Sequence, residues 1–260
     1  MPVPAPHRID ALMPAPAPSR RAWLLAVGLL LVAGLVWPGL AGKADPADSA
    51  DRPDGLPSSE PSSAAAATGA GTALAALAGL PVKGRAPRTG YAREQFGPAW
   101  SDTDHNGCDT RNDVLRRDLT AYTLKAGTHG CVVLRGTLHD PYTGDTVAFE
   151  RGRATSSRVQ VDHVVALSDA WQKGAQQLPT LRRTAFANDP LNLLAVVGSV
   201  NQGKSDGDAA TWLPPQRSFR CAYVARQVAV KQRYGLWVTA AERDAVRRVL
   251  TACPGQRLPG

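Results

Sequence analysis

Periodic apolar positions begin at about residue 73, and from there onward they predict short helices and short strands. Helices are expected at 73–80, 167–176, 217–233 and from Thr239 to about Leu250, and a short helix or a turn is expected at 112–119. Strands are expected at 131–139, 146–150, 158–162 and 191–197. Helices and strands mixed in this way, without an internal repeat, predict an α+β fold.

Two local patterns add detail to this outline. The turn-forming residues 140–145 (DPYTGD) separate the expected strands 131–139 and 146–150, so these strands should pair as a hairpin. Thr239 is followed three residues later by Glu242, which is a capping box and should start the last helix.

The chain before residue 73 predicts export. A basic lead at 1–21 precedes the uncharged, largely apolar segment 22–42. This pattern is typical of a secretory signal peptide, but the 21 positions are also enough to span a bilayer once as an anchor. Both alternatives place the rest of the chain outside the cytoplasm. Residues 43–72, rich in Ala, Ser, Pro and Gly, then predict a linker to the domain at 73–260.

All four cysteines lie in the predicted domain, at positions Cys108, Cys131, Cys221 and Cys253. An even number of cysteines in an exported domain predicts two disulfides, for which three pairings exist. We expect Cys108–Cys131 and Cys221–Cys253, because each pair lies within one local unit. No two cysteines stand two to four residues apart, so the spacing disfavours a cysteine zinc site.

Composition and charge narrow the class of partner. Since 43% of residues are hydrophobic and only one segment is long and apolar enough to span a membrane, a disordered chain and a polytopic membrane protein are excluded. The formal net charge is +8, but residues 1–60 carry five basic and six acidic residues, which leaves +9 on the remainder. A basic domain favours a polyanionic partner, either nucleic acid or an anionic polymer of the cell envelope.

The residues that carry candidate chemistry lie between 158 and 208. Asp162 and His163 stand at the end of an expected strand, Asn192 follows about thirty residues later, and Asn201 nine residues after that. Histidine suits a general base that acts on water near neutral pH. Carboxylate and amide oxygens suit Mg²⁺ or Mn²⁺ better than zinc. On these residues alone, a hydrogen-bonded Asp-His pair without catalytic function is the alternative.

Three further features are candidates for binding. Lys204 and Arg111 are positioned in the sequence to contact a phosphate, and Arg111 has pairing with a nearby carboxylate as its alternative. Asp102, Asp104 and Asn106 resemble the start of a calcium loop, although the rest of that loop departs from the usual pattern. A hydrogen-bonded loop held by its neighbouring cysteine is the alternative.

The order Asp-His, then Asn, then Asn-x-Gly-Lys-Ser-Asp resembles the HNH endonuclease motif of the ββα-metal type. The variant with Asp-His in front and Asn as the last key residue is similar to the HNH domain of RNA-guided CRISPR nucleases and to the C-terminal nuclease of GmrSD-type restriction enzymes. The longer stretch from Gly90-Tyr91 through Cys253-Pro254 resembles a group of exported HNH-family proteins with paired cysteines. The resemblance implies a ββα-metal core with an additional hairpin and C-terminal helices.

The resemblance also implies roles. His163 would be the general base, Asp162 and Asn201 would hold the metal, and Asn192 would orient His163 or the loop beside it. The chain lacks the second metal-side histidine of the fuller pattern, which disfavours a zinc-like site. It also has Ala166 where the family has proline, which leaves the turn after the motif open.

Together these features predict an exported, metal-dependent endonuclease of the HNH type. Its expected substrate is DNA, bound without sequence preference, with RNA as an open alternative. Membrane contact is expected only through the N-terminal segment, and the sequence indicates no protein partner. The alternative of another class is a catalytically silent module, anchored at the cell envelope, that binds an anionic polymer.

Overall fold

The computed structural model describes residues 71–259, all of which belong to one structural unit. The predictions for 1–21, for 22–42 and for most of the linker 43–72 therefore lie outside the described residues. Between residues 71 and 259, none of the helices has the length and apolarity needed to cross a membrane.

The described elements confirm an α+β fold. The α-helices are α2 (Ala73–Ala78), α3 (Thr110–Asp118), α4 (Leu167–Gln172), α5 (Thr180–Asn188), α6 (Gly198–Lys204), α7 (Arg220–Tyr234) and α8 (Ala240–Thr251). Short 3-10 helices are η1 (Arg93–Phe96), η2 (Ser156–Arg158), η3 (Ala175–Gln177) and η4 (Arg217–Phe219). The strands are β1 (Leu119–Leu124), β2 (Val133–His139), β3 (Thr146–Glu150), β4 (Val159–His163) and β5 (Leu193–Val197).

The strands form two antiparallel sheets, one of order β1-β2-β3 and one of β4 with β5. The predicted hairpin is β2–β3, and its turn is closed by a hydrogen bond from the Asp140 amide to the Asp145 carbonyl at 2.8 Å. Strand β1 was not expected, because five of its six residues are exposed and it has no alternation of buried and exposed positions.

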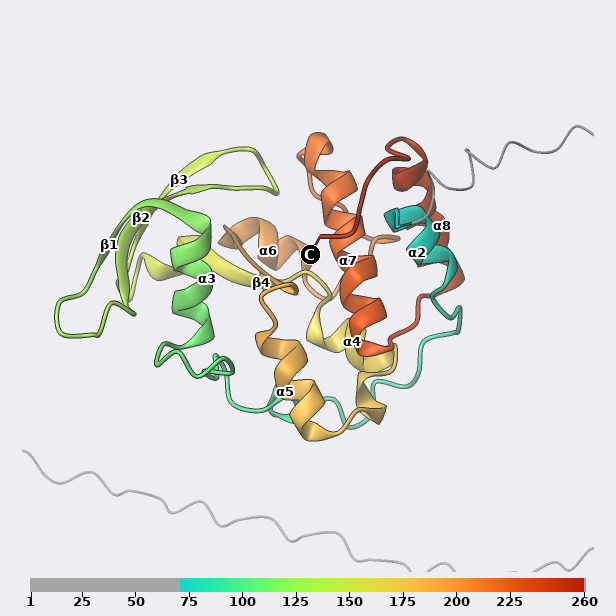
Figure 1. The fold of residues 1–260 in the computed structure, drawn as a ribbon, viewed down its shortest axis with the longest axis horizontal. Helices are drawn as coiled ribbons and strands as arrows, with labels where there is room; N and C mark the ends of the chain where they lie inside the picture. Colours follow the sequence, from blue (N-terminus) through green and yellow to red (C-terminus); the bar gives the residue numbers. More distant parts are fainter. Residues whose placement is uncertain (1–70, 260) are drawn as a thin grey trace, which may run out of the picture. The chain divides into compact units, whose positions relative to one another are not determined.

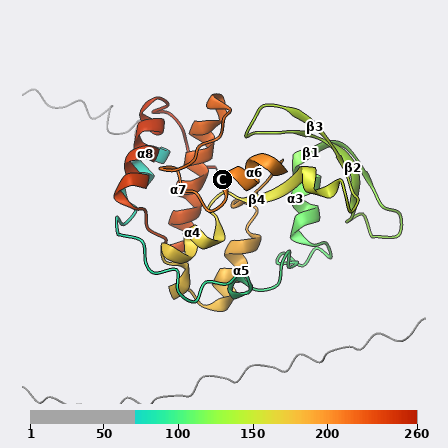
Figure 2. The same cartoon turned by 180° about the vertical axis from the view of Figure 1, so that it is seen from behind.

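The two-stranded sheet lies between the other layers (Figure 1). The three-stranded sheet and α3 lie on one side of β4 and α6, whereas α2, α7 and α8 lie on the other, and the reverse view agrees (Figure 2). Helix α6 begins directly after β5 and packs against both β4 and β5. This is the ββα unit that the resemblance implies, with α4 and α5 inserted between its two strands.

The side chains of the two-stranded sheet alternate between two cores. Val161 belongs to the core shared with α3 and the three-stranded sheet, where Leu115 and Phe149 are buried. Val196 belongs to the core shared with α2, α7 and α8, where Tyr223 is buried. Each such side chain contributes about 1.5–3 kcal/mol through burial, so both faces of this small sheet are held firmly.

One disulfide lies on each side of the two-stranded sheet, and the two pairings are those that the sequence predicts. Cys108–Cys131 joins the start of α3 to the start of β2, and Cys221–Cys253 joins the start of α7 to the end of α8. Each stabilises the fold by roughly 3 kcal/mol on the loop-entropy model.

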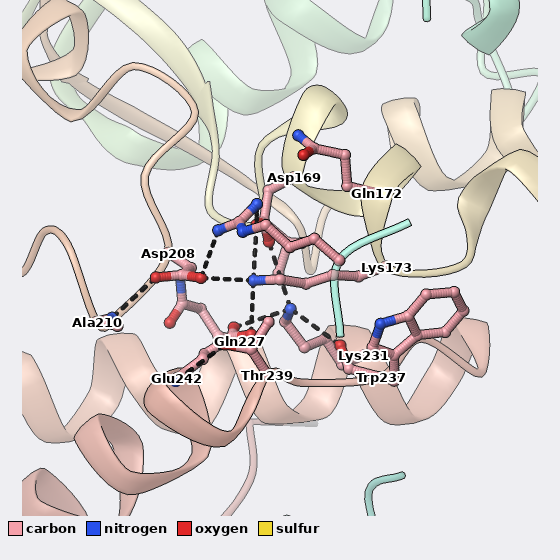
Figure 3. A network of polar contacts seen from close by, with 12 residues as sticks. Asp169, Gln172, Lys173, Asp208, Ala210, Gln227, Lys231, Trp237, Thr239 and Glu242 are labelled. Carbon is pink, nitrogen blue, oxygen red and sulfur yellow. Dashed lines mark hydrogen bonds and ion pairs between the residues drawn. The ribbon is translucent and has the colours of Figure 1, made fainter. Parts of the chain in front are cut away.

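A group of charges that is buried except for one arginine, and which we call the ion cluster, connects α4, α7, α8 and the chain after α6 (Figure 3). Its three cations and three anions are Arg85, Lys173, Lys231, Asp169, Asp208 and Glu242. Lys173 lies at its centre and bonds all three carboxylates at 2.6–2.7 Å. Only one of the two hydrogen bonds of the predicted capping box of α8 is formed. The Thr239 hydroxyl accepts from the Glu242 amide at 3.1 Å, whereas the Glu242 side chain bonds to Lys173 in the ion cluster.

Candidate active site

His163 is the last residue of β4, and its imidazole ring is buried. Its Nε2 lies 2.9 Å from the carbonyl oxygen of Ala187. A carbonyl oxygen can only accept, so Nε2 carries the hydrogen and Nδ1 keeps a free electron pair. Burial, together with the positive charges of Arg93 and Lys204, lowers the pKa of His163 from 6.5 to about 3. The ring is therefore neutral near pH 7 and can take up a proton only at Nδ1.

Asp162 is buried and faces the opposite side of the strand, as adjacent strand residues do. Tyr142 donates its hydroxyl hydrogen to Oδ2 at 2.6 Å, and the ammonium group of Lys204 lies 3.0 Å from Oδ1. Burial raises the pKa of Asp162 above its usual 3.8, whereas Lys204 and Tyr142 act in the opposite direction. These two donors fix the orientation of the carboxylate.

Lys204 lies in a different place from the one that the sequence predicts. Its side chain is fully buried, and its ammonium group also donates to the His163 carbonyl at 2.8 Å. We correct the expected phosphate contact accordingly: Lys204 is a buried counter-charge that binds Asp162 to the end of β4. Arg111 is half-buried and donates one hydrogen bond, to the Val159 carbonyl at 3.2 Å, and its guanidinium lies 6.0 Å from the Trp100 ring centre.

The two asparagines differ in position. Asn192 is fully buried; its Oδ1 accepts from the Val165 amide at 2.9 Å and its Nδ2 donates to the Val165 carbonyl at 3.3 Å. It therefore holds the loop that follows His163 rather than the imidazole itself. Asn201 lies on α6 and donates from Nδ2 to Gln160 at 2.9 Å. Ala166, at the site of the missing proline, has φ −59°, so the loop adopts a proline-like backbone without proline.

Two cavities adjoin His163. The larger, of about 420 Å³, is polar, and its walls include Asp162, His163, Asn201 and Asp206. Asp162 and His163 can share this cavity although they point to opposite faces, because the strand ends there. The smaller cavity, of about 180 Å³, is mainly apolar and is bounded by Phe96, Trp100 and Leu167 together with His163. The Trp100 ring lies nearly parallel to the imidazole, with ring centres 6.1 Å apart.

Asp162 and Asn201 both line the polar cavity, and their side chains carry a carboxylate and an amide, whose oxygens are ligands that Mg²⁺ and Mn²⁺ accept together with several waters. Both oxygens of Asp162 already accept a hydrogen bond, from Tyr142 and from Lys204, so an ion there would use the lone pairs that remain on this carboxylate. Within residues 71–259, no group of three or more His, Cys, Asp or Glu is placed to hold a metal ion. Any ion here would therefore keep much of its water shell.

The loop that resembles a calcium site forms bonds within itself. The Asp102 carboxylate accepts from the amides of Asn106 and Gly107 at 3.1 and 2.9 Å, and Asn106 accepts from the Cys108 amide at 2.8 Å. The Asp104 carboxylate accepts from the Asn106 side chain at 3.0 Å. Calcium binding at Asp102, Asp104 and Asn106 stays a prediction.

Four residues of the site were not assigned a role from the sequence: Tyr142, Arg88, Arg93 and Asp206. Tyr142 lies in the hairpin turn, where only turn chemistry was visible, and Arg88 and Arg93 lie about seventy residues before His163. Their approach to the site depends on tertiary packing. Asp206 did carry a signal, since it ends the run that begins at Asn201; its Oδ2 accepts from the Ser168 hydroxyl at 3.0 Å.

Comparisons with known proteins give one family model and one relative. The family model described as the C-terminal domain of GmrSD restriction endonucleases matches residues 109–249. The chain is also 40% identical over 179 residues to a protein of Arthroderma benhamiae described as an uncharacterized secreted protein. That match covers 68% of this chain and 82% of the relative. No solved structure matches the chain.

Proposed function

Because the chain belongs to the family of GmrSD restriction endonuclease C-terminal domains, which points to a nuclease-like enzyme, we propose that it is a metal-dependent HNH endonuclease. Its proposed reaction is the hydrolysis of phosphodiester bonds in DNA. The +9 charge outside the first 60 residues supports a polyanionic substrate bound largely through its backbone.

The observation that carries this proposal is the state of His163. Its Nε2 hydrogen is bonded to the Ala187 carbonyl, so the electron pair on Nδ1 is available beside the cavity that Asp162 and Asn201 line. A neutral imidazole with one nitrogen fixed by a main-chain carbonyl is a well-oriented general base.

In the proposed reaction, His163 Nδ1 takes a proton from a water molecule as the water oxygen attacks phosphorus. The bond from phosphorus to the 3′ oxygen then breaks on the opposite side. A divalent ion held by Asp162 and Asn201 would stabilise the negative charge on the phosphate and on the leaving oxygen. Tyr142 and Lys204 keep Asp162 in place, and Asn192 keeps the loop after His163 in place.

Action outside the cytoplasm is part of the proposal. Two disulfides persist best in an oxidising environment, and the Arthroderma benhamiae relative is described as secreted. The sequence of residues 1–42 predicts a signal peptide or an anchor, which supports the same location.

The test is the cleavage of plasmid DNA by the purified, oxidised protein in a series of divalent metals. We expect cleavage with Mg²⁺ or Mn²⁺, loss of cleavage with chelator, and a 10²- to 10⁴-fold slower rate for His163→Ala, about the contribution of a general base. The matched control is His139→Ala, which changes an exposed histidine of the three-stranded sheet and should cut like the wild type.

Two outcomes would contradict the proposal. Undiminished cutting by folded His163→Ala would remove the general base from the mechanism. Binding of polyanions that survives chelation, without cleavage in any metal, would favour the silent polymer-binding alternative instead.

A further inference from the structure

The positive charges near His163 divide into those that have partners and those that do not. Lys204 and Arg111, the expected phosphate contacts, bond to groups inside the protein. Arg88 and Arg93 are exposed, and within the described part of the chain neither guanidinium has a hydrogen bond or an ion pair. Arg88 and Arg93 therefore have free donors near His163, where the sequence predicts that Lys204 and Arg111 contact the phosphate.

Arg93 has the more central position of the two. It lines both the polar and the apolar cavity, and both of these cavities adjoin His163. Its charge is close enough to contribute to the lowered pKa of His163. Arg88 lines the polar cavity only, and its guanidinium lies 5.2 Å from the ring centre of Tyr91, which lines the same cavity.

The backbone that carries these arginines is anchored. Phe96, at the end of η1, is buried and contacts Phe186 and Trp171, with ring centres 5.8 and 6.3 Å away. Tyr91 packs edge-on against Trp171, and Arg183 donates to the Gln95 carbonyl at 2.6 Å. The segment is therefore fixed against α4 and α5, so that its two guanidinium groups are presented to the cavities from a rigid base.

We propose that Arg93, assisted by Arg88, binds the phosphate of the phosphodiester that lies beside His163; this rests on the proposed nuclease function. A planar guanidinium offers paired donors that match two phosphate oxygens, which a lysine cannot reproduce. The apolar cavity on the other side of Arg93, bounded by Phe96 and Trp100, then receives the nucleoside attached to that phosphate.

The first test measures binding without catalysis. The full protein is titrated into a fluorescent DNA oligonucleotide in chelator, at several salt concentrations. We expect Arg93→Ala to weaken binding about tenfold, as the loss of one charge-assisted contact implies, and to lower the slope of log affinity against log salt by about one. Arg93→Lys should restore the salt slope but only part of the affinity.

The matched control is Arg248→Ala, which removes an exposed arginine of α8 and the same unit of charge. We expect it to change the affinity much less than Arg93→Ala does. Equal losses from the two variants, or an unchanged affinity of Arg93→Ala, would overturn the proposal. All variants are first compared with the wild type by thermal melting, and we expect equal midpoints because both side chains are exposed.

A second measurement separates this inference from the proposed function. If the wild type cuts DNA and Arg93→Ala cuts with unchanged kcat/KM, the role of Arg93 is overturned and the nuclease function stands. If the wild type cuts nothing but Arg93→Ala binds DNA about tenfold more weakly, the nuclease function fails and the phosphate contact stands.

Discussion

The ion cluster and the His163 site are both buried groups of charge that contact α4, yet they differ in how fully their charges are paired. In the ion cluster three cations meet three carboxylates, and Lys173 alone bonds each carboxylate. At the His163 site, one lysine meets one carboxylate, and a neutral imidazole keeps an electron pair beside two cavities. Burial of charge alone therefore does not distinguish the two regions, whereas a group without a partner beside a cavity is found only at the His163 site of the two.

The pairing explains the two roles. The carboxylates of the ion cluster bond to cations on other elements of the protein, so the ion cluster holds α4, α7 and α8 together (Figure 3). Helix α4 starts four residues after His163, so the closed cluster also fixes the scaffold from which the open site is built. We propose that the ion cluster serves stability and that the His163 site serves chemistry.

The largest expected effect is on the free energy of unfolding of Lys173→Met. The change leaves three buried carboxylates with one cation fewer, and removing one partner of a buried ion pair costs about 3–5 kcal/mol. Denaturant unfolding of the oxidised protein measures it. The matched variant Arg85→Gln should lose much less, because the Arg85 side chain is 37% exposed and water can replace it.

The separation of roles would break if Lys173→Met kept its stability but lost DNA cleavage. That result would make the ion cluster part of the chemistry. If Lys173→Met lost less stability than Arg85→Gln, the ion cluster would contribute little to the stability of the fold.

The sequence predicts some of the helices and strands and misses others, for physical reasons. The strands β2 to β5 and the helices α3, α7 and α8 were predicted, because their apolar positions recur with the right period and their ends carry turn or cap residues. Helix α5 was not, since Leu181 is 85% exposed and its buried residues come only at its end. Helix α6 has glycine and polar residues throughout, so it depends on packing against β4 and β5.

The site could be predicted only where its chemistry is local in sequence. Asp162, His163 and Asn192 stand in a recognisable order, and the structure brings the first two to one cavity. Tyr142 and Arg93 arrive from separate elements, and Lys204 is turned inward by its bond to Asp162. Partner choice between distant side chains is a tertiary property that spacing along the chain does not carry.

Tyr142→Phe tests whether the orientation of Asp162 matters to the site. It removes a hydroxyl that donates to a buried carboxylate at 2.6 Å, and a hydrogen bond to a charged group contributes about 1.5–3 kcal/mol. We expect that loss in the free energy of unfolding together with a lower rate of DNA cleavage. Tyr122→Phe, in exposed β1, is the control and should change neither quantity. If Tyr142→Phe lost stability but cleaved DNA at an unchanged rate, Tyr142 would support the fold and not the activity.

The last prediction concerns how the free energy of unfolding depends on pH, which differs between the His163 site and the ion cluster. Burial lowers the pKa of His163 from 6.5 to about 3, so between these values the unfolded chain binds a proton at His163 and the folded protein does not. Stability from this residue is thus full above pH 6.5 and falls as the pH drops towards 3. Burial alone would raise the pKa of Asp169, but the charges of Lys231 and Lys173 hold it below 3.8, so the stability that Asp169 contributes to the ion cluster is lost only as the pH falls below that value.

Between pH 7 and pH 5, the difference in stability change between the wild type and His163→Ala therefore reports on His163. In metal-free buffer, we expect the wild type to lose about 2 kcal/mol more than His163→Ala across this interval, from 1.36 kcal/mol per unit of pH below 6.5. His105→Ala, at an exposed histidine, is the control and should follow the wild type. Parallel curves for the wild type and His163→Ala would mean that the imidazole takes up a proton as readily in the folded protein as in the unfolded chain. Burial would then not hold the ring neutral, and the contrast in pH dependence between the His163 site and the ion cluster would disappear.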